Sequence, residues 1–115
     1  MKKATIYHNP HCSKSRTALS LLHQHGYTVT VIEYLQEPLS HRQLKNLVKL
    51  LHIQPSDLLR KNETQYKELE LDKAAADAII KAMVKYPKLI ERPIVLIDEQ
   101  ALIARPPEKL LDILA

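Results

Sequence analysis

The beginning of the chain constrains the fold most, because it reads as a strand, a helix and a second strand with short connections. Apolar periodicity predicts a strand at residues 4–8 and a helix at residues 13–25. Gly26, the only glycine, falls where the end of that helix favours a left-handed residue. The β-branched residues 29–34 then predict the second strand. Such a unit joins parallel strands by a right-handed crossover, so we expect an α/β fold.

The stretch after the second strand is predicted to be mainly helical. Ser40 and Gln43 have the spacing of a capping box, and apolar residues follow them at helical intervals. Pro55 is expected in the first turn of a short helix. Asp72 is expected to cap a long helix that Pro87 ends. This helical block separates the second strand from the strand signals that follow it.

Strand signals return near the C-terminus. Residues 94–97 and 101–104 are predicted strands separated by a turn, and Pro106 and Pro107 open a last helix. The chain shows no repeats, low-complexity tracts or linkers. Residues 1–115 are therefore expected to form a single domain with one core.

Composition and charge exclude several classes of protein. No apolar run approaches the length of a membrane span, and the N-terminus lacks the apolar stretch of a secretory signal. The net charge of +4 is modest, and no Phe or Trp accompanies the five tyrosines, so we expect no nucleic-acid binding. The histidines show no metal-ligand spacing supported by cysteines or carboxylates, so we expect no metal. The chain is predicted to be a cytoplasmic monomer without membrane attachment.

The single cysteine, Cys12, lies between the first strand and the start of the first helix. A helix N-terminus and nearby cations lower a thiol pKa from about 8.5 to about 3.5–7.5, and His8, Lys14 and Arg16 are close in sequence. Cys12 is therefore predicted to be a reactive thiolate. Because the chain has no second cysteine, a thiol from another molecule must resolve any oxidised form.

Activation of the thiol alone gains little rate. A pKa lowered from about 8.5 to about 6.5 raises the thiolate fraction at pH 7 about 25-fold, but weaker nucleophilicity takes back about 8-fold. Most of the rate enhancement must then come from holding and neutralising an electrophile. Arg60, Arg92 and Arg105 are candidates, because an arginine fork binds oxyanions bidentately. Arg92 and Arg105 each precede a proline, which favours extended backbone at strand edges.

Four motifs in order along the chain resemble one known family, the glutathione- and glutaredoxin-coupled arsenate reductases. The motifs are His8-Asn9-Pro10-x-Cys12-x-x-Ser15-Arg16, Leu59-Arg60-Lys61-Asn62-Glu63, Arg92-Pro93-Ile94 and Arg105-Pro106. The resemblance runs from Thr5 to about Leu114. The chain is similar to the short members, since longer members carry a further C-terminal segment.

The resemblance implies a thioredoxin-like fold, with a mixed four-stranded sheet and a helical insertion between the second and third strands. It implies that Cys12 is the nucleophile that attacks arsenic. His8 would help to lower the pKa of Cys12, and Ser15 would hydrogen-bond the thiolate. Pro93 would occupy a cis-proline position beside the site, in agreement with the rule that cis peptide bonds precede proline.

The resemblance also implies a substrate and a source of electrons. Arg60, Arg92 and Arg105 would hold the arsenate oxyanion. Glutathione would act as co-substrate and attack the Cys12–arsenate adduct, and glutaredoxin would supply the second reduction. Arsenite would then leave, which implies a role in arsenic detoxification with no bound cofactor.

Two alternatives come from other functional classes. Regulators of the Spx type share this fold and bind RNA polymerase, but they typically carry a Cys-x-x-Cys switch where this chain has Ser15, and they lack Arg105. A glutathione-linked thiol oxidoreductase with another substrate would not need the arginines. In that case Arg60 could be a surface ion-pair partner of Glu63 or Asp57, and Arg92 and Arg105 could be solvated charges.

Overall fold

The structure is a computed structural model that describes residues 2–114. The described residues form two compact units. One unit runs to Glu37 and resumes at Arg92, and the other comprises Pro38–Glu91. The first unit contains the strands and the second contains the helical insertion. The expectation of a single domain stays a prediction, and the units are described separately below.

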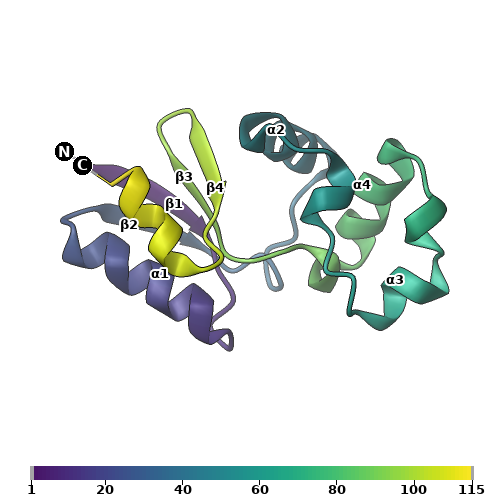
Figure 1. Ribbon diagram of the computed structural model, residues 1–115, viewed down its shortest axis with the longest axis horizontal. Coiled ribbons are helices and arrows are strands. Elements are labelled where there is room, and N and C mark those ends of the chain that lie inside the picture. The colour runs from purple at the N-terminus through teal and green to yellow at the C-terminus, as the bar shows by residue number, and fades with distance from the viewer. Residues whose placement is uncertain (1, 115) are drawn as a thin grey trace. The chain divides into compact units, whose positions relative to one another are not determined.

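Within the described residues of the first unit, four strands form one mixed sheet (Figure 1). The strands are β1 (Lys3–Tyr7), β2 (Thr28–Ile32), β3 (Ile94–Ile97) and β4 (Gln100–Ile103). Their order is β2-β1-β3-β4, with β1 parallel to β2 and the other pairs antiparallel. The predicted mixed four-stranded sheet and the parallel first pair are therefore confirmed.

The helices α1 (Ser13–Gln24) and η4 (Pro107–Asp112) pack together beside this sheet (Figure 1). Apolar residues from the strands and from both helices make one buried cluster, which includes Ala4, Ile6, Ala18, Leu22, Val95, Ile97 and Leu110. After α1, Gly26 has a φ of 81°, the left-handed conformation expected from its position. The segment opened by Pro107 is a 3₁₀ helix, which corrects the prediction of an ordinary last helix.

The second unit consists of α2 (His41–Leu51), η1 (Pro55–Leu58), α3 (Thr64–Glu68), η2 (Leu71–Lys73), α4 (Ala76–Lys85) and η3 (Pro87–Leu89). Ser40 and Gln43 form the predicted capping box at the start of α2, with both reciprocal hydrogen bonds present. Pro55 opens η1, as predicted. An isolated antiparallel bridge pairs Leu59, just after η1, with Ile90, just after η3.

The predicted helix start at Asp72 is wrong. Asp72 lies in the 3₁₀ turn η2, and α4 begins only at Ala76, without a side-chain cap. Leu71 is buried while Asp72 is exposed, so packing of Leu71 ties this segment into its own turn before α4 starts. The prediction that this helix ends near Pro87 is confirmed, because α4 ends at Lys85.

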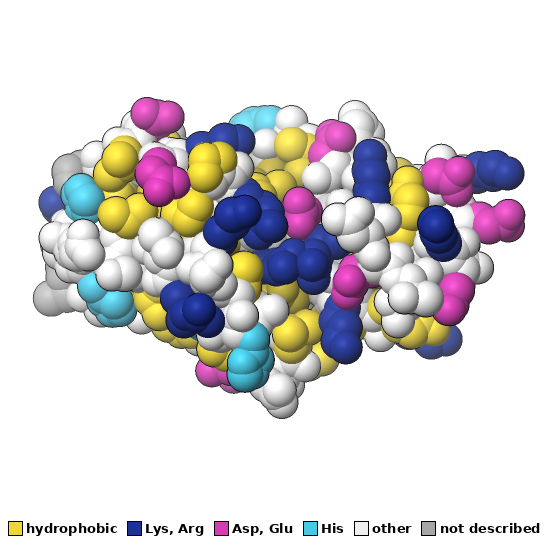
Figure 2. Space-filling model, turned by 60° about the horizontal axis from the view of Figure 1, so that its bottom comes forward, with side chains coloured by type: hydrophobic (Ala, Val, Ile, Leu, Met, Phe, Trp, Pro, Cys, Tyr) yellow, Lys and Arg dark blue, Asp and Glu magenta, His cyan; other side chains and the backbone are white. Residues whose placement is uncertain are grey.

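The surface carries charges of both signs. In Figure 2, Lys and Arg side chains on the displayed face are interspersed with Asp and Glu side chains. No helix within residues 2–114 is long and apolar enough to cross a membrane.

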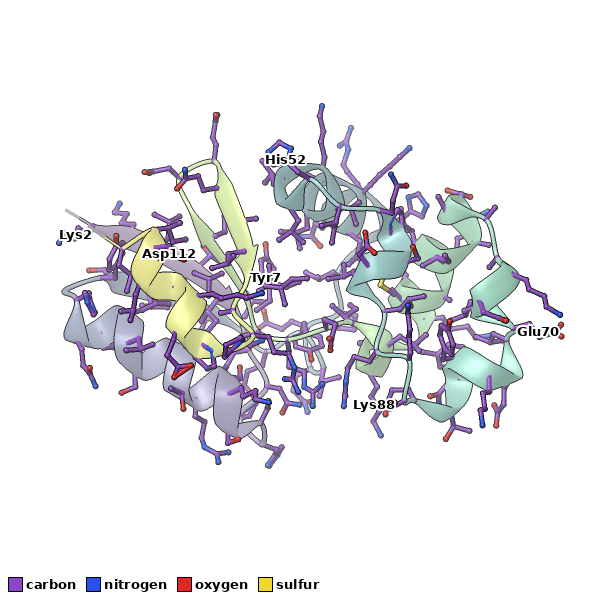
Figure 3. All side chains as sticks on the ribbon, in the orientation of Figure 1. Lys2, Tyr7, His52, Glu70, Lys88 and Asp112 are labelled. Carbon is purple, nitrogen blue, oxygen red and sulfur yellow. The ribbon has the colours of Figure 1, made fainter. Side chains whose placement is uncertain are left out.

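Tyr7, labelled in Figure 3 at the end of β1, is buried, and its burial raises the pKa of the phenol.

We expect the buried cluster of the first unit to dominate its stability. Replacement of Leu22, which is fully buried, by Ala should lower the free energy of unfolding by about 2–5 kcal/mol. The same change at Leu111, which is 51% exposed, should shift it by less than about 0.5 kcal/mol. Denaturant unfolding of both variants measures the difference, and equal losses would contradict this account of the core.

Candidate active site

Cys12 is the N-cap residue of α1, in the loop that follows β1. Its backbone is extended, its N–H donates to the carbonyl of Asn9 at 3.0 Å, and its carbonyl accepts from the N–H of Arg16 at 3.0 Å. The thiol is partly exposed. An N-cap side chain faces the unpaired N–H groups of the first helical turn, so the thiol lies where a helix stabilises negative charge.

The pKa of the Cys12 thiol is held below its ordinary value by several groups acting together. Burial raises this pKa, but the N–H of Ser15, the charge of Arg92, the N–H of Lys14 and the side chain of Arg105 all lower it and outweigh burial. Two of these contributions come from N–H groups in the first turn of α1, and two come from arginines. These surroundings favour the thiolate, while the role of Cys12 as nucleophile stays a prediction.

Arg92 lies two residues before β3 and Arg105 two residues after β4, so both flank the open end of the β3–β4 hairpin. Ile94 at the start of β3 pairs with Ile103 at the end of β4, so residues just outside the two strands meet at one edge of the sheet. A guanidinium nitrogen of Arg105, Nη1, donates to the carbonyl of Arg92 at 3.3 Å. The hairpin register thus brings the two arginines to the same place, as an oxyanion site requires.

Both of these arginines precede a cis peptide bond. The bond from Arg92 to Pro93 is cis, as predicted for a cis-proline at this position. The bond from Arg105 to Pro106 is also cis, and the sequence analysis did not anticipate it. A proline after each arginine was the available signal, because cis bonds in proteins occur almost only before proline.

The hydroxyl of Ser15 contacts His8 and Asn9, and the hydrogen bond to the thiolate that the resemblance implied for Ser15 stays a prediction. Ser15 Oγ lies 2.7 Å from Nδ1 of His8 and accepts a hydrogen bond from the N–H of Asn9 at 3.1 Å, and both His8 and Ser15 are buried. It is the N–H of Ser15, and not its hydroxyl, that lowers the pKa of Cys12.

The surroundings of His8 lower the pKa of its imidazole below the ordinary value. Burial lowers the pKa of its imidazole, and the charge of Arg16 lowers it further, while Glu33 raises it. The groups that lower the pKa of Cys12 lie on α1 and at the two arginines, so direct action of His8 on the thiol stays a prediction.

Arg16 has a role in the loop that the sequence analysis left open. Its Nη1 donates to the carbonyl of Pro10 at 2.8 Å, which ties the first turn of α1 back to the loop that precedes Cys12. Lys14 contributes through its backbone N–H. The place of Lys14 as the second residue of the helix was the signal that its N–H acts on Cys12. The N–H at this position has no partner within the helix, whatever the side chain.

Arg60 lies in the helical unit, two residues after the end of η1. Its N–H donates to the carbonyl of Leu89 at 2.7 Å. Its guanidinium lies 3.8 Å from the carboxylates of both Glu63 and Glu91. The structure therefore shows an ion-pair partner that the sequence suggested, Glu63, and adds a second. Binding of an oxyanion by Arg60 stays a prediction.

No group of three or more His, Cys, Asp and Glu side chains able to hold a metal ion is found among residues 2–114. The chemistry of the described site rests on a single thiol, two arginines and the N–H groups of a helix. This combination of groups is typical of proteins that use one cysteine as a nucleophile against an anion.

Comparison with known proteins gives the family. A model of the ArsC family matches residues 7–113, so the chain belongs to the ArsC family. It is 45% identical over 115 residues to YfgD, an uncharacterised protein of Escherichia coli K12, and the match covers 97% of each chain. It is 44% identical to an arsenate reductase of Escherichia coli, over 99% of this chain and 82% of that protein.

A solved structure supports the same assignment. The arsenate reductase of Vibrio cholerae superposes with a TM-score of 0.94 at 45% identity, over 98% of both chains. The predicted thioredoxin-like fold with a helical insertion between β2 and β3 is thereby confirmed.

We predict that Arg92 stabilises the Cys12 thiolate by its charge. Arg92→Gln should raise the pKa of Cys12, because it removes a positive charge that lowers this pKa. A rise of one unit slows thiol alkylation about tenfold at a pH below both pKa values. The rate of reaction with iodoacetamide as a function of pH measures the change.

Lys14→Gln is the matched control for this experiment. It removes the same charge from a residue that acts on Cys12 through its backbone N–H, so its pH profile should stay close to that of the unmodified protein. Equal shifts in both variants would show that net charge alone, and not the position of Arg92, controls the thiol.

Proposed function

We propose that this protein reduces arsenate to arsenite with Cys12 as the nucleophile. The observation that carries the proposal is the convergence of Arg92, Arg105 and the first N–H groups of α1 on one thiol. A thiolate and an arsenate anion repel each other, and the arginines supply the positive charge that allows them to approach. The relatives named as arsenate reductases support the choice of oxyanion.

The first step is a displacement at arsenic. The sulfur of Cys12 forms a bond to arsenic, and one arsenate oxygen takes up protons and leaves as water. Arsenic stays in its pentavalent state in this step. Arg92 and Arg105 hold the remaining oxygens, and the guanidinium of Arg60 is the third proposed ligand.

The electrons come from outside the chain. Cys12 is the only cysteine, so no internal thiol can resolve the adduct. The sulfur of glutathione bonds the sulfur of Cys12, the S–As bond breaks, and its electron pair stays on arsenic, which leaves as arsenite. Glutaredoxin then removes glutathione from the resulting mixed disulfide and restores the Cys12 thiol. Overall, two thiols become one disulfide, arsenate becomes arsenite, and one water is released. We propose that the protein works in this way as a monomer in the cytoplasm, without a bound cofactor.

The test is arsenite formation by the purified protein. With arsenate, glutathione, glutaredoxin and an NADPH-driven recycling system, arsenite should accumulate, and Cys12→Ser should abolish turnover. Arg105→Gln should lower kcat about 10²–10³-fold, which is the usual cost of losing one group that stabilises an oxyanion. Lys88→Gln, a change at an exposed lysine of η3 (Figure 3), should leave the rate unchanged.

Other outcomes identify the alternatives. A fully active Cys12→Ser variant would falsify the mechanism. Deglutathionylation that survives the loss of Arg92 and Arg105, with no arsenite formed, would assign a glutathione-linked oxidoreductase with another substrate. Co-purification with RNA polymerase, again without arsenite, would assign a regulator.

A further inference from the structure

The backbone of the helical unit fixes three charged residues, Arg60, Glu63 and Glu91, next to one another. The N–H of Arg60 donates to the carbonyl of Leu89 at 2.7 Å, and the N–H of Glu91 donates to the carbonyl of Leu58 at 2.8 Å. These two hydrogen bonds belong to the antiparallel pairing of the segments that follow η1 and η3. The N–H of Glu63 donates to the carbonyl of Arg60 at 3.3 Å, so a turn brings the second glutamate back to the arginine.

The guanidinium of Arg60 pairs with both carboxylates through different nitrogens. Its Nη1 lies 3.8 Å from an oxygen of Glu63, and its Nε lies 3.8 Å from an oxygen of Glu91. Both separations are too long for hydrogen bonds. The carboxylates therefore attract the guanidinium without taking up its N–H groups, which stay available to an oxyanion.

The charges of these three side chains sum to −1. Each side chain is only 24–27% exposed, so water screens their charges in part. An oxyanion that bonds the guanidinium of Arg60 is repelled by the carboxylates of Glu63 and Glu91. Coulomb energy is proportional to the product of the charges, so each carboxylate opposes a dianion twice as strongly as a monoanion in the same place.

We propose that Glu63 and Glu91 are specificity-determining residues that lower the affinity of Arg60 for oxyanions, and for dianions more than for monoanions. The inference rests on the proposed function in taking Arg60 as an oxyanion ligand, and it names the form of the substrate. Arsenate can bind as a monoanion or as a dianion, and the two glutamates favour the monoanion. The monoanion already carries protons that the departing oxygen needs, and it is repelled less by the thiolate of Cys12.

The sign of the effect separates this role from a purely structural one. If Glu63 and Glu91 served only to hold the side chain of Arg60 in place, loss of either carboxylate would weaken the binding of every anion alike. If they repel the anion, loss of either carboxylate tightens binding, and the gain grows with the charge of the anion.

The experiment compares two tetrahedral anions, perchlorate with one negative charge and sulfate with two. The Nε–H signal of Arg60 in ¹⁵N-labelled protein, assigned with Arg60→Lys, reports binding at one ionic strength. Glu63→Gln should lower the Kd of perchlorate about threefold, the size expected for one partly exposed charge pair. It should lower the Kd of sulfate about ninefold, because the doubled energy squares the factor.

Glu91→Gln should act in the same direction, and it keeps the backbone hydrogen bond to Leu58. The two glutamates lie on different segments, so a folding defect in one variant leaves the other to decide. Glu70→Gln is the matched control, because it makes the same charge change at an exposed residue that precedes η2 (Figure 3). Both Kd values should stay unchanged in this control.

Several results would overturn the inference. Weaker binding in Glu63→Gln and Glu91→Gln would assign a holding role, and equal gains for both anions would remove the selectivity. Equal gains in Glu70→Gln would show that net charge alone is responsible. A signal of Arg60 that responds to neither anion in any variant would also refute the inference. Because no arsenate is used, a failure to form arsenite would leave these outcomes intact.

Discussion

The first turn of α1 is the element on which the rest of the site depends. A short loop takes the chain from the end of β1 to the N-cap position occupied by Cys12, and the free N–H groups of the turn then face the sulfur. This arrangement follows from the crossover between two parallel strands, which requires a helix to begin near the carboxyl end of β1. Arg16 and Ser15 strengthen it by tying the loop back onto the helix.

The helix alone cannot support attack on an oxyanion. Its N-terminus is equivalent to about half a positive charge, whereas a thiolate and an arsenate together carry at least two negative charges. The β3–β4 hairpin supplies the remainder, because its register places Arg92 and Arg105 at the same edge. The parallel half of the sheet thus provides the nucleophile, and the antiparallel half provides the charge that the substrate needs.

Local sequence patterns predicted the structure well where one short-range interaction decides it. The capping box of Ser40 and Gln43 is present because its hydrogen bonds join residues three apart. Asp72 has the same chemistry as a capping residue, but burial of Leu71 draws it into a separate turn, and α4 begins four residues later without a side-chain cap. Tertiary burial overrides capping propensity, because a buried leucine contributes about 1.5–3 kcal/mol and a cap about 1 kcal/mol.

The sequence by itself determined the thiol, its place at the start of a helix, its dependence on an outside reductant, and the arginines that precede prolines. These properties depend on residue type and on neighbours along the chain. Only the tertiary structure decided that the Ser15 hydroxyl meets His8, that Arg60 lies near Glu91, and that the N–H of His8 bonds the carbonyl of Ile32. A hydrogen bond requires partners within about 3 Å, and it is strand register and packing that bring residues distant in the chain to that separation.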